Sequence, residues 1–182
     1  MSKKIIRVAF IGPESSGKTT LCKLLAKRFN TVCVEEHSRT YLNNLVGKNY
    51  SERDVVNIYK QQLDEENEKL KTANKILFID TEFLNGKVWV EHKFGISNAW
   101  FEEQICINPY DLYLLTRPDL KWEPDPLREN PNKGDYFFNL YRKHLNQYKL
   151  TYQVIEGDED ARLEQAYKEV NKFIASYKHN KS

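Results

Sequence analysis

The stretch that decides the fold is "VAFIGPESSGKTTLCKLLAKRF", residues 8–29. It contains "GPESSGKT", Gly12 to Thr19, which fits the phosphate-binding pattern G-x-x-x-x-G-K-[ST]. An apolar run precedes the pattern, and leucines at helical spacing follow it, so we expect a strand, a loop and a helix in that order. The glycines let successive backbone N–H groups point at phosphate oxygens, at the positive end of the helix dipole. The motif therefore predicts a nucleoside triphosphate site.

Two residues of this loop have predicted chemical roles. We expect Lys18 to lie against the β and γ phosphates and the Thr19 hydroxyl to bind Mg²⁺. The residues expected to contact the nucleotide are Gly12, Pro13, Glu14, Ser15, Ser16, Gly17, Lys18, Thr19 and Thr20.

The base of the nucleotide is less clearly indicated. "NKGD" at 132–135 and "TRPD" at 116–119 approach guanine-reading motifs, but the first has no apolar strand before it. The second carries Arg117 where a lysine is expected. The guanine interpretation is therefore weak, and we expect ATP.

Composition limits the other classes of function. The 182 residues are enough for one domain, and the net charge of +2 gives no broad positive surface for nucleic acid or anionic membrane. No run approaches the roughly 20 apolar residues that span a bilayer. We expect a soluble, cytoplasmic protein that binds a small molecule, and the sequence leaves the oligomeric state open. Cys22, Cys33 and Cys106 have no metal-site or disulfide spacing, so we expect buried free thiols.

The apolar runs alternate with helical patterns. We expect strands at 5–11, 31–35, 75–80, 111–116 and 151–157, and helices at about 18–29, 51–72 and 159–178. The stretch 82–94 fits either a strand or a helix. Alternation of this kind predicts a parallel sheet covered on both faces, with ligands at the carboxyl ends of its strands.

Several separate stretches together resemble one family. "GPESSGKTTL", "EEHSRTYL", "FIDTEFLNGKVW" and "DLYLLTRPDLKWEPDPLR" follow one another within residues 5–128. In that order they resemble the ribosylnicotinamide kinase domain of the NadR proteins. The resemblance implies a P-loop NTPase fold of three α/β/α layers, with a five-stranded, mostly parallel sheet and a lid at about 117–135. It also implies one kinase domain over 1–182, without the adenylyltransferase domain that NadR proteins commonly carry. Glu82 departs from the family, which usually has aspartate there.

Two carboxylates are candidates for catalysis. Asp80 ends an apolar strand, from where it can reach Mg²⁺ directly or through water, or else cap the following helix. Glu36 follows another strand on the same sheet edge. The resemblance implies that Glu36 to Arg39 lie by the acceptor nucleoside, where Glu36 could bind ribose hydroxyls or take the proton of the 5′-hydroxyl. The sequence does not decide whether Asp80 or Glu36 is the base.

Further candidates lie in the second half of the chain. Arg117 and Arg128 flank the proline-rich stretch "PDLKWEPDPL", which we predict to be a lid. A closing lid could bring the positive charge of these arginines to a transferred phosphoryl group. Gly157 and Arg162 follow the last strand, where related architectures hold adenine, an expectation that rests on analogy.

An acceptor with a cationic pyridinium ring favours aromatic faces. We therefore expect Trp89 and Trp122 to contact it, together with Asp125 of the "W-x-x-D-x-x-R" block.

These features predict an ATP- and Mg²⁺-dependent kinase that converts nicotinamide riboside to the mononucleotide. Two alternatives stay open: a kinase for another nucleoside or a nucleotide, and an ATP-binding regulatory module that transfers no phosphate.

Overall fold

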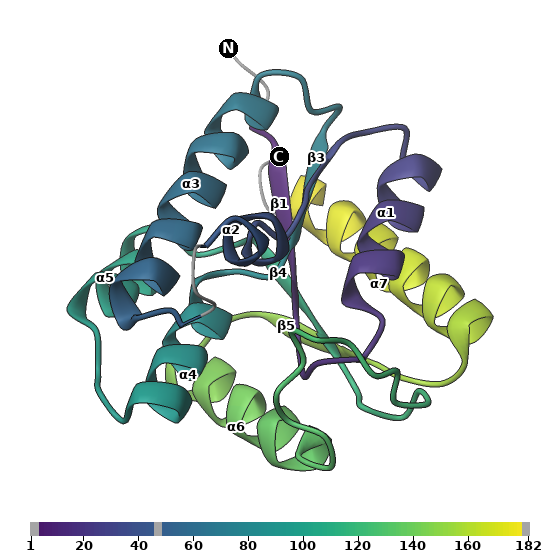
Figure 1. Cartoon of the computed structure of the whole chain (residues 1–182). Helices are drawn as coiled ribbons and strands as arrows, with labels where there is room; N and C mark the ends of the chain where they lie inside the picture. The colour runs from purple at the N-terminus through teal and green to yellow at the C-terminus, as the bar shows by residue number, and fades with distance from the viewer. Residues whose placement is uncertain (1–3, 46–48, 180–182) are drawn as a thin grey trace.

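A computed structural model describes residues 4–45 and 49–179 (Figure 1). Five of its segments form a parallel sheet with the strand order β2-β3-β1-β4-β5. The strands are β1 (Ile6–Ile11), β2 (Cys33–Val34), β3 (Ile76–Asp80), β4 (Leu112–Thr116) and β5 (Tyr152–Ile155). The helices are α1 (Lys18–Arg28), α2 (Ser38–Asn43), α3 (Glu52–Leu70), α4 (Phe83–Phe94), α5 (Ala99–Ile107), α6 (Gly134–Gln147) and α7 (Glu159–His179). The predicted fold class is confirmed.

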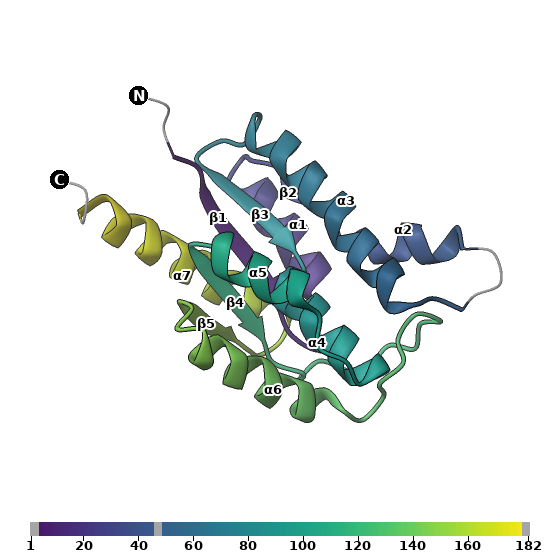
Figure 2. The ribbon, with the colours of Figure 1, turned by 90° about the vertical axis from the view of Figure 1, so that its left-hand side faces the viewer.

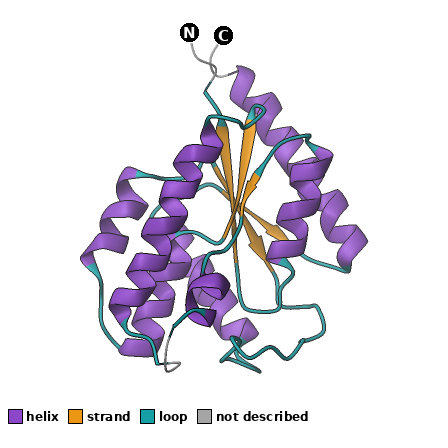
Figure 3. Cartoon of the chain, turned by 45° about the horizontal axis from the view of Figure 1, so that its top comes forward, coloured by secondary structure: helices purple, strands orange, loops and turns teal. Residues whose placement is uncertain are grey.

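The sheet lies between two layers of helices (Figure 3). Because successive side chains of a strand point to opposite faces, Val8 and Phe10 of β1 pack in one cluster with α1 and α7. Ala9 and Ile11 pack in the other cluster, with α3, α4, α5 and α6. Both faces are covered, which is why the strands are apolar throughout rather than alternating.

The ambiguous stretch 82–94 forms helix α4 and no strand. Glu82 caps this helix, because its buried carboxylate accepts hydrogen bonds from the N–H groups of Leu84 (2.8 Å) and Asn85 (3.3 Å). Burial raises the pKa of Glu82 to about 8. The capping role that was an alternative for Asp80 thus belongs to Glu82.

Helices α2, α5 and α6 were not predicted from the sequence. The predicted strand at 31–35 was too long, because β2 has two residues. It found the start of α3 correctly, because Ser51 and Asp54 form a reciprocal capping box.

The prediction of buried thiols was right for Cys22 and wrong for Cys106, which is exposed, while Cys33 is half-buried. Cys106 lies on the outer side of α5, whose inner side buries Phe101 and Ile105. Among the helices that the structure describes, none is long and apolar enough to cross a membrane.

Candidate active site

Four of the predicted functional segments lie at the carboxyl ends of strands that run side by side and in the same direction (Figure 2). The phosphate loop follows β1, Asp80 ends β3, Glu36 follows β2, and Arg117 follows β4. Because the strands are parallel, these segments meet at one edge of the sheet.

The shape of the phosphate loop depends on its first and last glycine. Gly12 has φ of 149° and Gly17 has φ of 79°, both in the region that side chains disfavour. A Cβ on Gly12 would lie 2.3 Å from Oγ1 of Thr116 and 2.8 Å from its carbonyl oxygen. Only glycine therefore lets the loop approach β4 this closely.

Lys18 folds over this loop. Its Nζ donates to the carbonyl oxygens of Gly12 (2.9 Å) and Pro13 (2.7 Å). Burial lowers the pKa of Lys18, although the negative charges of Glu36 and Asp80 act in the opposite direction. A phosphate beside Lys18 would favour its charged form further.

Asp80 has the properties of a Mg²⁺ ligand. Its carboxylate is 1% exposed, interacts with the Thr19 hydroxyl, and accepts a long bond from Thr81 Oγ1 (3.4 Å). Its Oδ2 is buried and has no hydrogen-bond partner among the described residues. Burial, and next the charge of Glu36, raise the pKa of Asp80 to about 6. A cation held by this oxygen and Thr19 would satisfy the unpaired atom, so the residues fit Mg²⁺.

In the described part of the chain, no three His, Cys, Asp or Glu side chains form a metal-binding group. A Mg²⁺ ion held by Thr19 and Asp80 would take water and nucleotide phosphate oxygens as further ligands, as is usual for this ion.

Glu36 lies close enough to Asp80 and Lys18 to alter the pKa of both. It is exposed and accepts a hydrogen bond from the Ser38 hydroxyl, at the start of α2. The structure therefore brings together Lys18, Asp80 and Glu36, which are three of the five residues predicted for catalysis.

Residues 117–133, between β4 and α6, contain no helix or strand and are called the lid segment below. Arg128 donates to Ser15 Oγ of the phosphate loop (3.2 Å), and its guanidinium lies 6.0 Å from the Trp122 ring centre. On the other side, Asp125 accepts from Arg39 of α2 (2.7 Å). The lid segment thus contacts both the phosphate loop and the predicted acceptor side.

Arg117 lies elsewhere. Its Nε is 2.6 Å from Glu156 Oε2, and its guanidinium lies over the Phe138 ring at 4.8 Å. The Arg117 side chain is thus joined to the loop after β5 and to α6, and its catalytic role stays a prediction.

Arg162 ties this neighbourhood to the phosphate loop. Its buried guanidinium donates to the carbonyl oxygens of Gly157 (2.7 Å), Ser16 (3.0 Å) and Arg117 (2.9 Å), and it pairs with Asp119. The bond to Ser16 supports the backbone of the phosphate loop, and the other two join it to the segments after β5 and β4. Contact of Gly157 or Arg162 with adenine stays a prediction.

The two tryptophans lie on different segments. Trp89 of α4 donates from Nε1 to the Tyr50 hydroxyl (2.9 Å), and the two rings meet edge to face. Trp122 lies in the lid segment.

Sequence reasoning missed Tyr50 and Thr116. The Thr116 hydroxyl bonds with Ser16 Oγ (2.6 Å), which fixes the phosphate loop against β4. Its place at the end of a predicted strand was the available signal for Thr116, whereas Tyr50 gave none.

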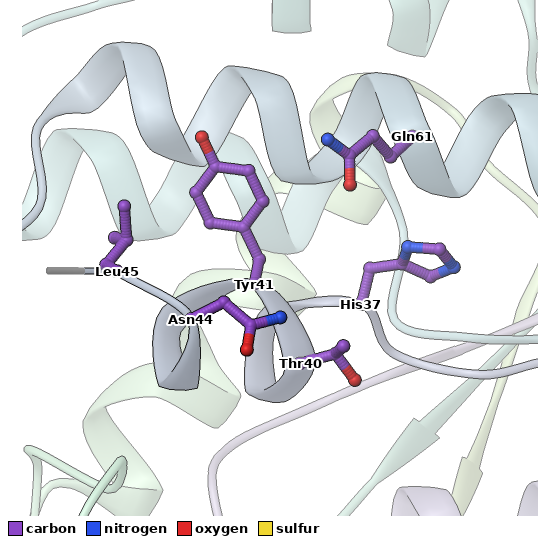
Figure 4. Close-up of a pocket in the computed structure, with 6 residues that line it drawn as sticks. All are labelled: His37, Thr40, Tyr41, Asn44, Leu45 and Gln61. Carbon is purple, nitrogen blue, oxygen red and sulfur yellow. The ribbon is translucent and has the colours of Figure 1, made fainter.

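Two open cavities adjoin the acceptor side. One of about 270 Å³ is lined by Glu35, Glu36, His37, Thr40, Glu65 and Lys69. The other, of about 320 Å³ (Figure 4), lies between α2 and α3 and is lined by His37, Thr40, Tyr41, Asn44, Leu45 and Gln61. They share His37 and Thr40, so the space continues from Glu36 along α2.

Comparison with curated proteins gives the trifunctional NAD biosynthesis/regulator protein NadR of Salmonella typhimurium and of Escherichia coli. Each is 32% identical over 165 residues, a match that covers 86% of this chain and 40% of the relative. The chain thus spans less than half the length of these relatives, and the resemblance seen in the sequence is confirmed.

Solved structures agree on the fold. A NadR protein in complex with NR has a TM-score of 0.79 and 23% identity, over 93% of this chain and 51% of that one. A deoxyadenosine kinase from M. mycoides has a TM-score of 0.60 and 14% identity, over 92% of this chain and all of that one. A family model described as an AAA domain matches residues 7–162, most of the chain, and the chain therefore belongs to that family.

Proposed function

We propose that this chain is an ATP- and Mg²⁺-dependent kinase that phosphorylates the 5′-hydroxyl of nicotinamide riboside. The observation that carries the proposal is the meeting of Lys18, Asp80 and Glu36 at one edge of the sheet. The likeness to NadR, including a NadR structure in complex with NR, supports this acceptor.

The donor half of the reaction follows from the phosphate loop. Its backbone N–H groups and Lys18 would hold the β and γ phosphates, and Thr19 and Asp80 would hold Mg²⁺. When bound there, Mg²⁺ would supply positive charge that offsets the negative charge developing on the transferred phosphoryl group. Arg128, beside Ser15, would add positive charge from the lid segment.

The acceptor half depends on Glu36. With Oδ2 of Asp80 assigned to Mg²⁺, Glu36 is the carboxylate left to accept the proton of the 5′-hydroxyl. The aromatic rings of Trp89 and Trp122 would face the cationic pyridinium ring, and Arg39 with Asp125 would border the ribose.

A second candidate is a kinase for another nucleoside, which the structural likeness to deoxyadenosine kinase favours.

One experiment separates the candidates. The purified protein is incubated with ATP, Mg²⁺ and a panel of nucleosides and nucleotides, and product masses are followed.

Nicotinamide mononucleotide as the main product would support the proposal, and another phosphorylated product would support the second candidate. Binding of an ATP analogue without any product would indicate a regulatory module instead.

A further inference from the structure

The phosphate loop carries an acidic residue, Glu14, whose contacts leave the loop. Its carboxylate accepts hydrogen bonds from the backbone N–H groups of Glu129 (3.3 Å) and Asn130 (3.0 Å), and from the Asn130 side chain (3.5 Å). These donors are more than 110 residues away in the sequence, and all belong to the lid segment. A carboxylate beside a phosphate site repels phosphate, so its presence there needs another reason.

The neighbouring Ser15 strengthens the same attachment. Ser15 Oγ accepts from the backbone N–H of Glu123 (3.0 Å) and from Arg128 Nη1 (3.2 Å). Glu14 and Ser15 therefore hold both ends of the segment 123–130, and Arg128 is itself one of the groups that bind Ser15.

The side chain of Glu129 attaches the lid segment to residues outside the phosphate loop. Its carboxylate accepts from Lys93 Nζ (2.6 and 2.8 Å) and from the Tyr50 hydroxyl (3.2 Å). Tyr50 in turn accepts from Trp89. Glu129 thus receives Lys93 and Tyr50 on its side chain while its N–H donates to Glu14, so the lid segment joins the predicted acceptor side to the phosphate loop.

We propose that Glu14 is a positioning residue for phosphoryl transfer: its carboxylate holds the lid segment on the phosphate loop and so keeps Arg128 beside Ser15. Hydrogen bonds to a carboxylate are stronger than those between neutral groups, which suits a single side chain that fixes a segment without helix or strand. The proposal rests on the proposed kinase function for its catalytic part, but not for the attachment itself.

The attachment is tested without substrate, by hydrogen–deuterium exchange in the Glu14→Gln variant. A glutamine keeps the shape but loses the charge and presents an NH₂ group to one of the two N–H donors. We expect the backbone amides of Glu123, Asp125 and residues 127–130 to exchange about tenfold faster than in the wild type, since Pro124 and Pro126 have no amide hydrogen. Glu103→Gln, which removes an equal charge from an exposed position on α5, should leave these amides unchanged.

The positioning role is tested by kinetics on two backgrounds. Glu14→Gln should lower kcat about tenfold and leave the KM for ATP unchanged or lower, because a repulsive charge near the phosphates is removed. In an Arg128→Ala background the same change should lower kcat less than twofold, because Glu14 acts through Arg128.

Unchanged exchange in Glu14→Gln overturns the attachment, and a tenfold loss that persists without Arg128 overturns the positioning role. A higher KM for ATP with unchanged kcat would instead mean that Glu14 serves only nucleotide binding. If the wild type makes no nicotinamide mononucleotide, the proposed function fails, while exchange still decides whether Glu14 holds the lid segment.

Discussion

The phosphate loop and the acceptor side of the site are built differently. The loop owes its shape to contacts among residues 12–19 and with the end of β4, such as the bond between Ser16 and Thr116. The acceptor side is assembled from distant segments, through pairs such as Arg39 with Asp125 and Trp89 with Tyr50. A change in the loop should therefore remove one large contribution, whereas changes on the acceptor side should have smaller, distributed effects.

Lys18→Ala should give the largest loss. Removing the cation that we propose to contact the β and γ phosphates should lower kcat by on the order of 10²- to 10³-fold. Steady-state kinetics measures the loss, and circular dichroism checks the fold, which should persist because Lys18 is only half-buried. A variant with full activity would show that the phosphate loop is not the donor site.

Asp80→Asn should separate stability from activity. Burial raises the pKa of Asp80 from 3.8 to about 6, so the folded state binds this proton more tightly than the unfolded chain. The resulting stabilisation is present below pH 3.8 and is lost as the pH rises through 6, so ionised Asp80 destabilises the fold at pH 7.5.

Asparagine removes this charge, and we expect the Tm at pH 7.5 to rise by about 3 °C, or about 1 kcal/mol. Loss of the carboxylate that we propose to hold Mg²⁺ should lower Mg²⁺-dependent turnover about 100-fold. Thermal unfolding and Mg²⁺ titrations of the rate measure the two effects, with Glu103→Gln as the control that changes neither. A lower Tm together with unchanged turnover would refute both assignments.

The same contrast explains what could be predicted from the sequence. The phosphate loop was predictable because its chemistry is local: Gly12, Lys18 and Thr19 fall within eight residues. The positions of Asp80 and Glu36 were predictable because Asp80 ends one apolar strand and Glu36 follows another, and parallel strands bring such positions to one edge.

Contacts between distant segments could not be predicted in this way. Nothing in the sequence around Glu14 indicates that it binds the backbone of Glu129 and Asn130, because backbone donors carry no signature of residue type. Similarly, the sequence predicted a contact of Arg162 with adenine, which stays a prediction, and gave no sign that its N–H groups donate to the carbonyl oxygens of Gly157, Ser16 and Arg117. Cys106 was misjudged because the sequence did not reveal helix α5, and hence not which side of it faces water.

The smallest expected effects concern the ion pair between Arg39 and Asp125, which lie on α2 and the lid segment. Arg39 is more than half exposed, so the pair should contribute less than about 1 kcal/mol to stability. If the pair acts by holding the lid segment near the acceptor, Arg39→Ala and Asp125→Asn should each raise the KM for nicotinamide riboside about threefold.

A double-mutant cycle on this KM gives the sharper result. Two residues that act only through each other should give a double variant no worse than either single one. A direct contact of Arg39 with the acceptor would instead make Arg39→Ala the more harmful change, and the effect of Asp125→Asn would then add to it. The KM for ATP should stay constant throughout, because neither residue contacts the phosphate loop among the hydrogen bonds and ion pairs of the described residues. A parallel rise in that KM would mean that the two sides of the site are less separate than their contacts indicate.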